Sequence, residues 1–164
     1  MRTFMESIEA EYRRYRSTAE AAIEQLSDEE LVAVPAGSAS SVATIAWHIS
    51  GNLRSRFTDF LTTDGEKPWR DRESEFVART PTRDELLAFW NEGWDILLDS
   101  LTDLADANLV DTVRIRGEAV SVIQALHRSL AHTTYHVGQI VHRAKELRGE
   151  DWNYLSIPPG ASSG

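Results

Sequence analysis

The chain has 164 residues, contains no cysteine and carries a formal net charge of -9. That length suits one domain with its own core, so we expect a single domain over residues 1–164. The absence of cysteine excludes disulfides, thiolate ligands and a cysteine nucleophile, and it fits a reducing, cytoplasmic compartment. The acidic charge predicts no nucleic-acid partner. The start of the chain lacks a signal-peptide pattern, and no apolar run approaches the roughly twenty residues of a membrane span.

Four amphipathic segments dominate the chain. Their apolar residues recur at steps of three and four, which predicts helices over residues 4–26, 41–61, 82–104 and 122–147. Three of these helices begin with a capping-box sequence, namely Thr3 with Glu6, Thr82 with Glu85, and Ser121 with Gln124. Gly149 is a natural C-terminal cap for the last helix. Four long helices joined mostly by short links favour an all-α four-helix bundle.

The segments between the helices differ in character. Gly51 lies inside the second predicted helix, where glycine is unfavourable, so we expect a neighbour to pack closely against it. Residues 62–80 form an unusually long loop, and its charged part, residues 66–75, is interpreted as solvated in preference to an active-site lid. Alternating apolar and charged residues predict a short hairpin between residues 110 and 120.

The end of the chain is too apolar for a free tail. Trp152, Tyr154, Leu155 and Ile157 follow the last helix, and Pro158-Pro159 prevents the helix from continuing. We therefore expect residues 152–164 to pack on the bundle as an extended tail. Because such an apolar segment also suits an interface, we expect a homodimer.

The last predicted helix carries two histidines on one face. His132 and His136 are four residues apart, a spacing at which two rings can chelate one ion. Both lie on one flank of the apolar stripe, with Gln139 and Arg143 beside them. A chance pair is the alternative, because short motif matches carry that risk. A serine triad built on Ser129 and His132 is disfavoured, because no nucleophile elbow accompanies it.

The second predicted helix has a similar arrangement. His48 lies on one flank of its stripe, in line with Asn52 and Arg56, so two helices of a bundle can face each other across three imidazoles. Three neutral imidazoles suit a divalent metal and leave positions open for water or substrate. A single histidine such as His48 is more often a hydrogen-bonded residue at the edge of a core, and that alternative stays open. His127 is interpreted as such an edge residue, and His142 as a solvated residue near a helix C-terminus.

Three stretches resemble one branch of the DinB/YfiT-like superfamily. They are residues 48–70, which begin His-Ile-Ser-Gly-Asn, residues 132–141, which read His-Thr-Thr-Tyr-His-Val-Gly-Gln-Ile-Val, and residues 151–158, which read Asp-Trp-Asn-Tyr-Leu-Ser-Ile-Pro. The resemblance covers most of the chain and implies a four-helix bundle that binds a metal through one histidine of the second helix and a His-x-x-x-His pair of the last. The matching positions are His48, His132 and His136. Some members are thiol-dependent transferases or isomerases that use bacillithiol, mycothiol or glutathione, and others are described as metal-dependent hydrolases.

These features lead us to predict a metal-dependent S-transferase. Because the chain has no cysteine, its substrates would be a low-molecular-weight thiol from solution and an electrophile, brought together at the metal. Arg56 and Arg143 are candidates for binding substrate carboxylates, and Asn52 and Gln139 for orienting substrate or water. Zinc or nickel is the expected metal, with iron, manganese or copper as alternatives.

Two other functions stay open at this point. In metal-assisted hydrolysis the ion activates water, and Glu66 or Glu73 from the long loop would be the general base. In the other, the chain is a non-catalytic metal-binding bundle. An open coordination position that faces a pocket distinguishes the enzyme from the structural site.

Overall fold

The computed structural model describes residues 2–34, 37 and 40–158. This part of the chain is mostly helical, as predicted, and contains α1 (Thr3–Glu24), α2 (Asp28–Val32), α3 (Val42–Phe57), α4 (Arg83–Thr102) and α5 (Val122–Arg148). The predicted hairpin is present just before α5 and consists of β1 (Thr112–Ile115) and β2 (Glu118–Ser121). Three short 3-10 helices complete the structure: η1 (Glu73–Phe76), η2 (Asp106–Val110) and η3 (Gly149–Asp151).

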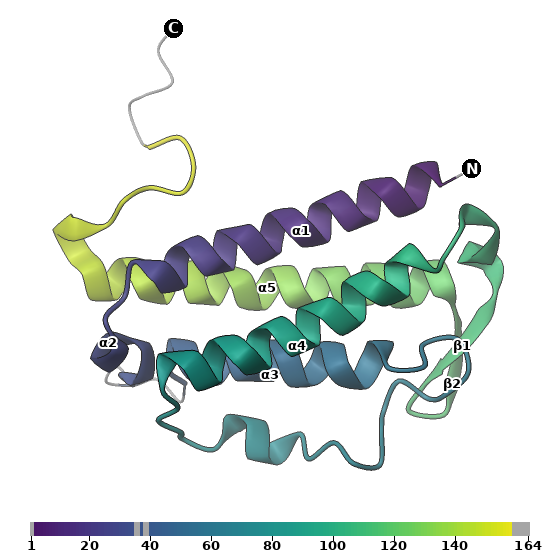
Figure 1. Cartoon of the computed structure of the whole chain (residues 1–164), viewed down its shortest axis with the longest axis horizontal. Coiled ribbons are helices and arrows are strands. Elements are labelled where there is room, and N and C mark those ends of the chain that lie inside the picture. Colours follow the sequence, from purple (N-terminus) through teal and green to yellow (C-terminus); the bar gives the residue numbers. More distant parts are fainter. Residues whose placement is uncertain (1, 35–36, 38–39, 159–164) are drawn as a thin grey trace, which may run out of the picture.

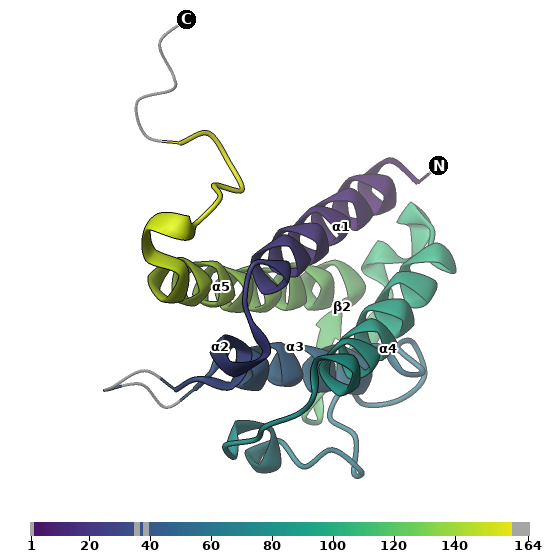
Figure 2. The same ribbon diagram turned by 60° about the vertical axis from the view of Figure 1, so that its left-hand side comes forward.

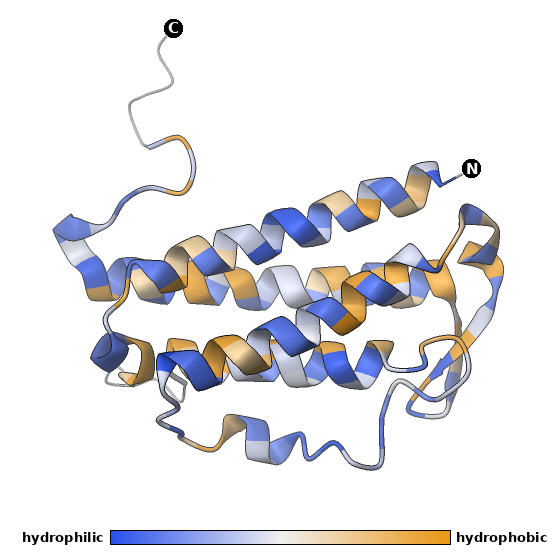
Figure 3. Cartoon of the chain, in the orientation of Figure 1, coloured by the Kyte–Doolittle hydropathy of each residue, from blue (hydrophilic) through white to orange (hydrophobic). Residues whose placement is uncertain are grey.

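The four long helices pack around one core. Figures 1 and 2 show α1 lying along α5 and α4 lying along α3, and α3 also contacts α5. Apolar and polar residues alternate along each long helix (Figure 3), because each helix turns one face to the core and another to solvent. The largest fully buried side chains include Tyr12, Trp90 and Trp94. The contact between α3 and α5 matters most for function, because these helices carry the candidate histidines.

Two predicted features at helix ends are wrong. The second predicted helix extends to residue 61, but α3 ends at Phe57, and Asp59 adopts a positive φ of 49° that a continuing helix excludes. The predicted capping box of Thr3 and Glu6 does not form. Instead, the Asp106 carboxylate accepts hydrogen bonds from the backbone N–H groups of Phe4 and Met5 in the first turn of α1. The other two predicted capping boxes are confirmed, and so is the Gly149 cap with its positive φ of 55°.

The long loop is anchored to the hairpin. The Asp64 carboxylate accepts hydrogen bonds from the backbone N–H groups of Arg116, at 2.8 Å, and Gly117, at 2.7 Å. The interpretation of residues 66–75 as solvated is therefore wrong in part: Lys67 and Glu75 are buried, and the Arg70 side chain is 2% exposed. Fixing the loop at the hairpin holds these buried groups against α3.

The tail is only partly packed. Trp152 is buried and Leu155 packs against the core, and Asn153 exchanges two hydrogen bonds with Gln25. Tyr154, however, is 48% exposed and Ile157 is 74% exposed, so the expectation that all the apolar residues of the tail pack is wrong for these two residues. Residues 159–164 of the predicted tail lie outside the described residues. Within the described part of the chain, no helix combines the length and apolar character that a membrane crossing requires.

Candidate metal centre

Three histidines meet where α3 packs against α5. His48 comes from α3, and His132 and His136 come from adjacent turns of α5, so that one ring nitrogen of each lies within 4.8 Å of the others. The ring centroids of His48 and His136 are 4.8 Å apart, and those of the α5 pair are 4.5 Å apart. His48 is 2% exposed, and the other two are half-buried. The structure therefore brings together the three residues that the sequence predicts as ligands.

Hydrogen bonds on the outer side of the cluster orient two of the rings. His48 donates from Nδ1 to the Glu75 carboxylate at 2.7 Å, and His136 donates from Nδ1 to the Gln139 side-chain oxygen at 2.7 Å. In a neutral imidazole this leaves Nε2 unprotonated. Nε2 of His48 faces Nε2 of His132 at 3.3 Å. Such outer hydrogen bonds fix the tautomer and orientation of histidines that ligate metals.

Glu75 reaches His48 because Gly51 has no side chain. A Cβ atom at Gly51, one turn along α3 from His48, would overlap the Glu75 carboxylate. The expectation of a close neighbour at Gly51 is confirmed, and that neighbour is Glu75. Arg70 holds the same carboxylate from the other side, with Nε donating at 2.8 Å and Nη2 at 2.9 Å. The carboxylate is thus fixed between a guanidinium and an imidazole.

The pKa shifts favour neutral rings at His132 and His136 and an ionised carboxylate at Glu75. Burial, together with the neighbouring charges of His136 and His48, lowers the pKa of His132 to about 3. Burial also lowers the pKa of His136, although its hydrogen bond to Gln139 opposes the shift. For Glu75, burial alone would raise the pKa, but hydrogen bonds from Arg70 and His48 outweigh burial and lower it. Neutral imidazoles are the form that binds a metal.

The residues present fit a divalent transition-metal ion. All three candidate ligands are imidazoles, which suit zinc, nickel, copper and iron. Among the described residues, Nδ1 of His132 is buried without a hydrogen-bond partner, while the other ring nitrogen faces the unprotonated nitrogen of His48. In the metal-free state one of these two Nε2 atoms donates a hydrogen bond to the other, and a metal ion ligated by both would take the place of that proton. Three protein ligands also leave coordination positions open, as in catalytic sites.

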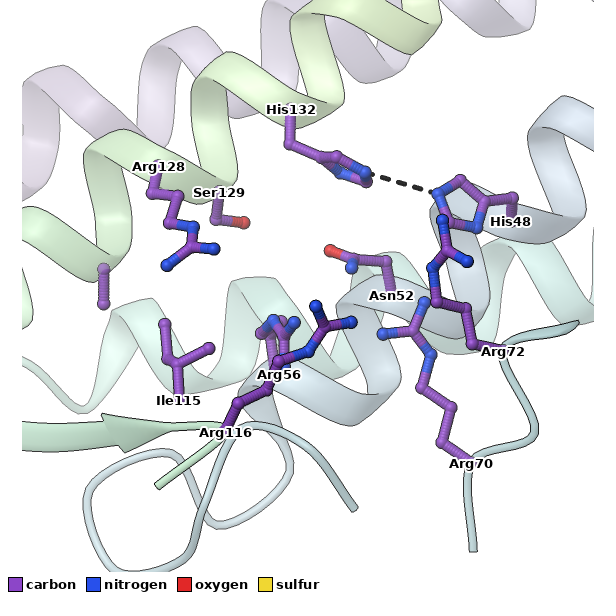
Figure 4. A pocket seen from close by; sticks show the side chains of 11 residues that line it. His48, Asn52, Arg56, Arg70, Arg72, Ile115, Arg116, Arg128, Ser129 and His132 are labelled. Atoms are coloured by element: carbon purple, nitrogen blue, oxygen red, sulfur yellow. Dashed lines mark hydrogen bonds between the residues drawn. The ribbon is translucent and has the colours of Figure 1, made fainter. Parts of the chain in front are cut away.

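Two cavities adjoin the histidines. The first has a volume of about 210 Å³ and is drawn in Figure 4, and the second has a volume of about 410 Å³. His48 and His132 line both cavities. Of the residues predicted to contact substrate, Asn52 and Arg56 line the first cavity, and Gln139 lines the second. The candidate metal centre therefore lies between two spaces that a small molecule can enter.

Some sequence-based assignments need correction. Arg143 is not among the residues that line either cavity, and its guanidinium pairs with Glu146 at 3.0 Å. The general-base candidate Glu73 has a side chain that is 84% exposed, whereas the carboxylate at the histidines belongs to Glu75, which the sequence reasoning missed. In the sequence, only the glycine at position 51 inside a helix indicated a close neighbour here, and it did not identify that neighbour as Glu75.

The remaining residues of interest fall outside the centre. His142 has a 73% exposed side chain and pairs with Glu146, as expected for a solvated residue. His127 is exposed and contacts the Phe4 ring edge-on. Glu66, the other general-base candidate, forms ion pairs with Arg56 and Arg116.

The fold and the site define a class: a helical protein in which two packed helices present a candidate three-histidine metal centre between two cavities. Comparison with known families identifies the family to which the chain belongs. The chain belongs to the family DUF1572, described as a protein of unknown function, whose model matches residues 1–161. None of the curated proteins compared with the chain matches it.

Proposed function

We propose that this chain is a metal-dependent S-transferase of the DinB/YfiT-like type, which joins a low-molecular-weight thiol to an electrophilic substrate. One observation carries the proposal: His48 and His132 line both cavities, so two molecules can approach the same centre from two sides. Holding two reactants in contact replaces a bimolecular encounter and lowers the barrier.

The three histidines would hold the ion, with zinc or nickel the metals we propose. When bound, a divalent ion with neutral ligands keeps its full charge and stabilises a thiolate relative to the thiol. Glu75 and Gln139 orient His48 and His136 through their Nδ1 hydrogen bonds. These contacts fix the rings before any substrate arrives.

The reaction is a substitution at carbon. The sulfur of the thiol forms a bond to the electrophilic carbon, the leaving group departs with the electron pair of its bond, and the thiol proton passes to water. Because the chain has no cysteine, the thiol comes from solution. The second cavity includes the rings of Phe76 and Tyr135, which suit an apolar group on one of the two substrates.

Hydrolysis is the less favoured reaction for a specific reason. It requires a general base that takes a proton from water. Glu75 is the carboxylate at the histidines, but Arg70 and His48 bind both of its oxygens and lower its pKa. A carboxylate held in this way is a poor base. Transfer of a thiolate needs no such base.

A thiol-consumption assay tests the proposal. Chelator-treated protein is loaded with zinc or nickel and incubated with glutathione, bacillithiol or mycothiol and a panel of electrophiles, and the loss of free thiol is followed. We expect conjugation with at least one pair of substrates. The His132→Ala variant should lose it, whereas His142→Ala, which changes an exposed histidine of the same helix, should retain it. Ester or amide hydrolysis without thiol consumption, or metal binding without either reaction, would overturn the proposal.

A further inference from the structure

The first cavity is lined by arginines from four separate parts of the chain. They are Arg56 of α3, Arg70 and Arg72 of the long loop, Arg116 of the hairpin turn, and Arg128 of α5. Figure 4 shows their guanidinium groups gathered around one space beside His48 and His132. None of the described residues that line this cavity is acidic, although the chain as a whole carries a net charge of -9. Such a concentration of positive charge in an acidic protein indicates an anionic ligand.

The neighbouring carboxylates neutralise this cluster only in part, because three of them, Glu66, Glu73 and Glu75, face five arginines, and of these Glu73 pairs with Arg72 at 2.7 Å. Glu66 pairs with Arg56 at 3.3 Å and with Arg116 at 2.9 Å, so one carboxylate serves two guanidinium groups. Glu75 is shared between Arg70 and His48. Burial lowers the pKa of Arg56, the Glu66 carboxylate opposes this, and the charges of Arg70 and Arg116 lower it again. The arginines therefore repel one another across the cavity, and a bound anion would relieve that repulsion.

Arg70 offers an unused donor. Its side chain is 2% exposed, and among the described residues its Nη1 group has no hydrogen-bond partner. The Glu66 carboxylate lies 3.9 Å from Nη1, which is too long for a hydrogen bond. A buried N–H group without an acceptor is costly and rare in folded proteins. An oxygen atom of a ligand in the cavity would satisfy it.

We propose that the first cavity binds a small organic anion with at least two negative charges, either a phosphate monoester or a di- or tricarboxylate. Guanidinium groups approaching from several directions match the several oxygens of such groups, and each fork can bind two of them. A volume of about 210 Å³ limits the ligand to a small molecule. The proposal rests on the proposed function in one respect: it names the charged part of one of the two substrates, whose reacting atom would lie toward His48 and His132.

Anion binding can be measured without the metal, so calorimetry on the chelator-treated full chain is the test. Inorganic phosphate, glycerol phosphate, succinate and citrate are titrated, with acetate as the singly charged control. We expect the multiply charged anions to bind and acetate to bind at least about tenfold more weakly, because it engages fewer guanidinium groups. Tighter binding of the phosphates would identify a phosphate ester, and tighter binding of succinate or citrate a polycarboxylate.

Matched arginine variants locate the site. Arg128→Gln and Arg116→Gln should each weaken the binding of the best anion about tenfold or more, through loss of a charged donor. Arg143→Gln is the control, because Arg143 lies on the same helix as Arg128 but does not line the cavity. Circular dichroism of each variant shows that the helices are intact. Equal weakening by Arg143→Gln, equal affinity for acetate, or no anion binding would overturn the proposal.

The two proposals fail in different ways. If the anion binds and the arginine variants weaken it, but no thiol is consumed with any electrophile, only the proposed transferase activity is wrong. If thiol transfer occurs and the Arg128→Gln variant has the same KM values for both substrates as the wild type, only the proposal of the anion site is wrong.

Discussion

Glu75 accepts a 2.7 Å hydrogen bond from Nδ1 of His48. It reaches that position only because Gly51, which lies on the same helix as His48, has no side chain. A residue of the long loop is thereby coupled to a candidate ligand on α3. The contact joins a regular helix, α3, to an irregular loop, and no pattern in the sequence pairs these two segments. Its consequences for metal binding can be tested at each of the three residues.

Glu75→Gln should weaken metal binding while preserving the fold. The amide keeps the size of the side chain but removes the negative charge that His48 donates to, and loss of such an outer partner lowers metal affinity about 10- to 100-fold. The measurement is the Kd for zinc by competition with a chromophoric chelator. Glu73→Gln is the matched control, because Glu73 lies on the same 3-10 helix with an 84% exposed side chain. Equal affinities of the two variants would show that Glu75 does not orient His48.

Gly51→Ala should also weaken metal binding, through displacement of Glu75 rather than loss of it. The added Cβ would overlap the Glu75 carboxylate, so the loop must shift. Gly138→Ala provides the contrast, because no neighbour lies within 4 Å of a Cβ at that position of α5. That control should stabilise the protein by about 0.5–1 kcal/mol, the helix-propensity gain of alanine over glycine. Urea denaturation and zinc titration of both variants measure the two effects, and a Gly51→Ala variant with unchanged zinc affinity would contradict the prediction.

The five histidines should separate into two groups. Replacing His48, His132 or His136 by alanine should each remove most of the bound metal, because two imidazoles form a far weaker chelate than three. Replacing His127 or His142 should leave metal content near that of the wild type, since both are exposed and outside the cluster. Helicity should survive in all five variants, because the buried apolar core supplies most of the stability. Metal analysis measures the bound ion, and circular dichroism measures the helicity. Retention of metal by His48→Ala would show that α3 contributes no ligand to the site.

The sequence predicted the features that depend on residues close together in the chain. Helical periodicity located four long helices, and the i, i+4 spacing placed His132 and His136 on one face. The features it missed depend on contacts between distant segments. Asp106 caps α1 across about a hundred residues, and Asp64 binds the hairpin turn some fifty residues away. No local pattern distinguishes Glu75 from Glu73.

The same distinction applies to the cavity arginines. Arg56 was predicted as a substrate-binding residue because it lies on the same helical flank as His48. Arg116 and Arg128 were missed, because their approach to α3 depends on how the hairpin and α5 pack. Arg143, predicted from its position on the flank of α5, lies beyond the two cavities, because that flank continues past the part of α5 that lines them.

The stability of the metal-free protein should depend on pH through His132. Its pKa in the folded protein is about 3, against an ordinary value of 6.5, because burial disfavours the charged ring. Between these two values the unfolded chain takes up a proton that the folded chain does not, so acid favours unfolding. The free energy of unfolding should therefore be highest above the ordinary pKa and should fall steadily as the pH is lowered toward the folded value. His136, whose pKa is also lowered by burial, acts in the same direction.

The matched variants for this prediction are His132→Gln and His142→Gln. His132→Gln removes the buried ring, so its stability should fall less between about pH 7.5 and about pH 5 than that of the wild type. His142→Gln, which changes an exposed ring of the same helix, should follow the wild type. Urea denaturation of the chelator-treated proteins at several pH values gives the comparison. Parallel losses of stability in the wild type and His132→Gln would show that the folded protein binds a proton at His132 as readily as the unfolded chain does.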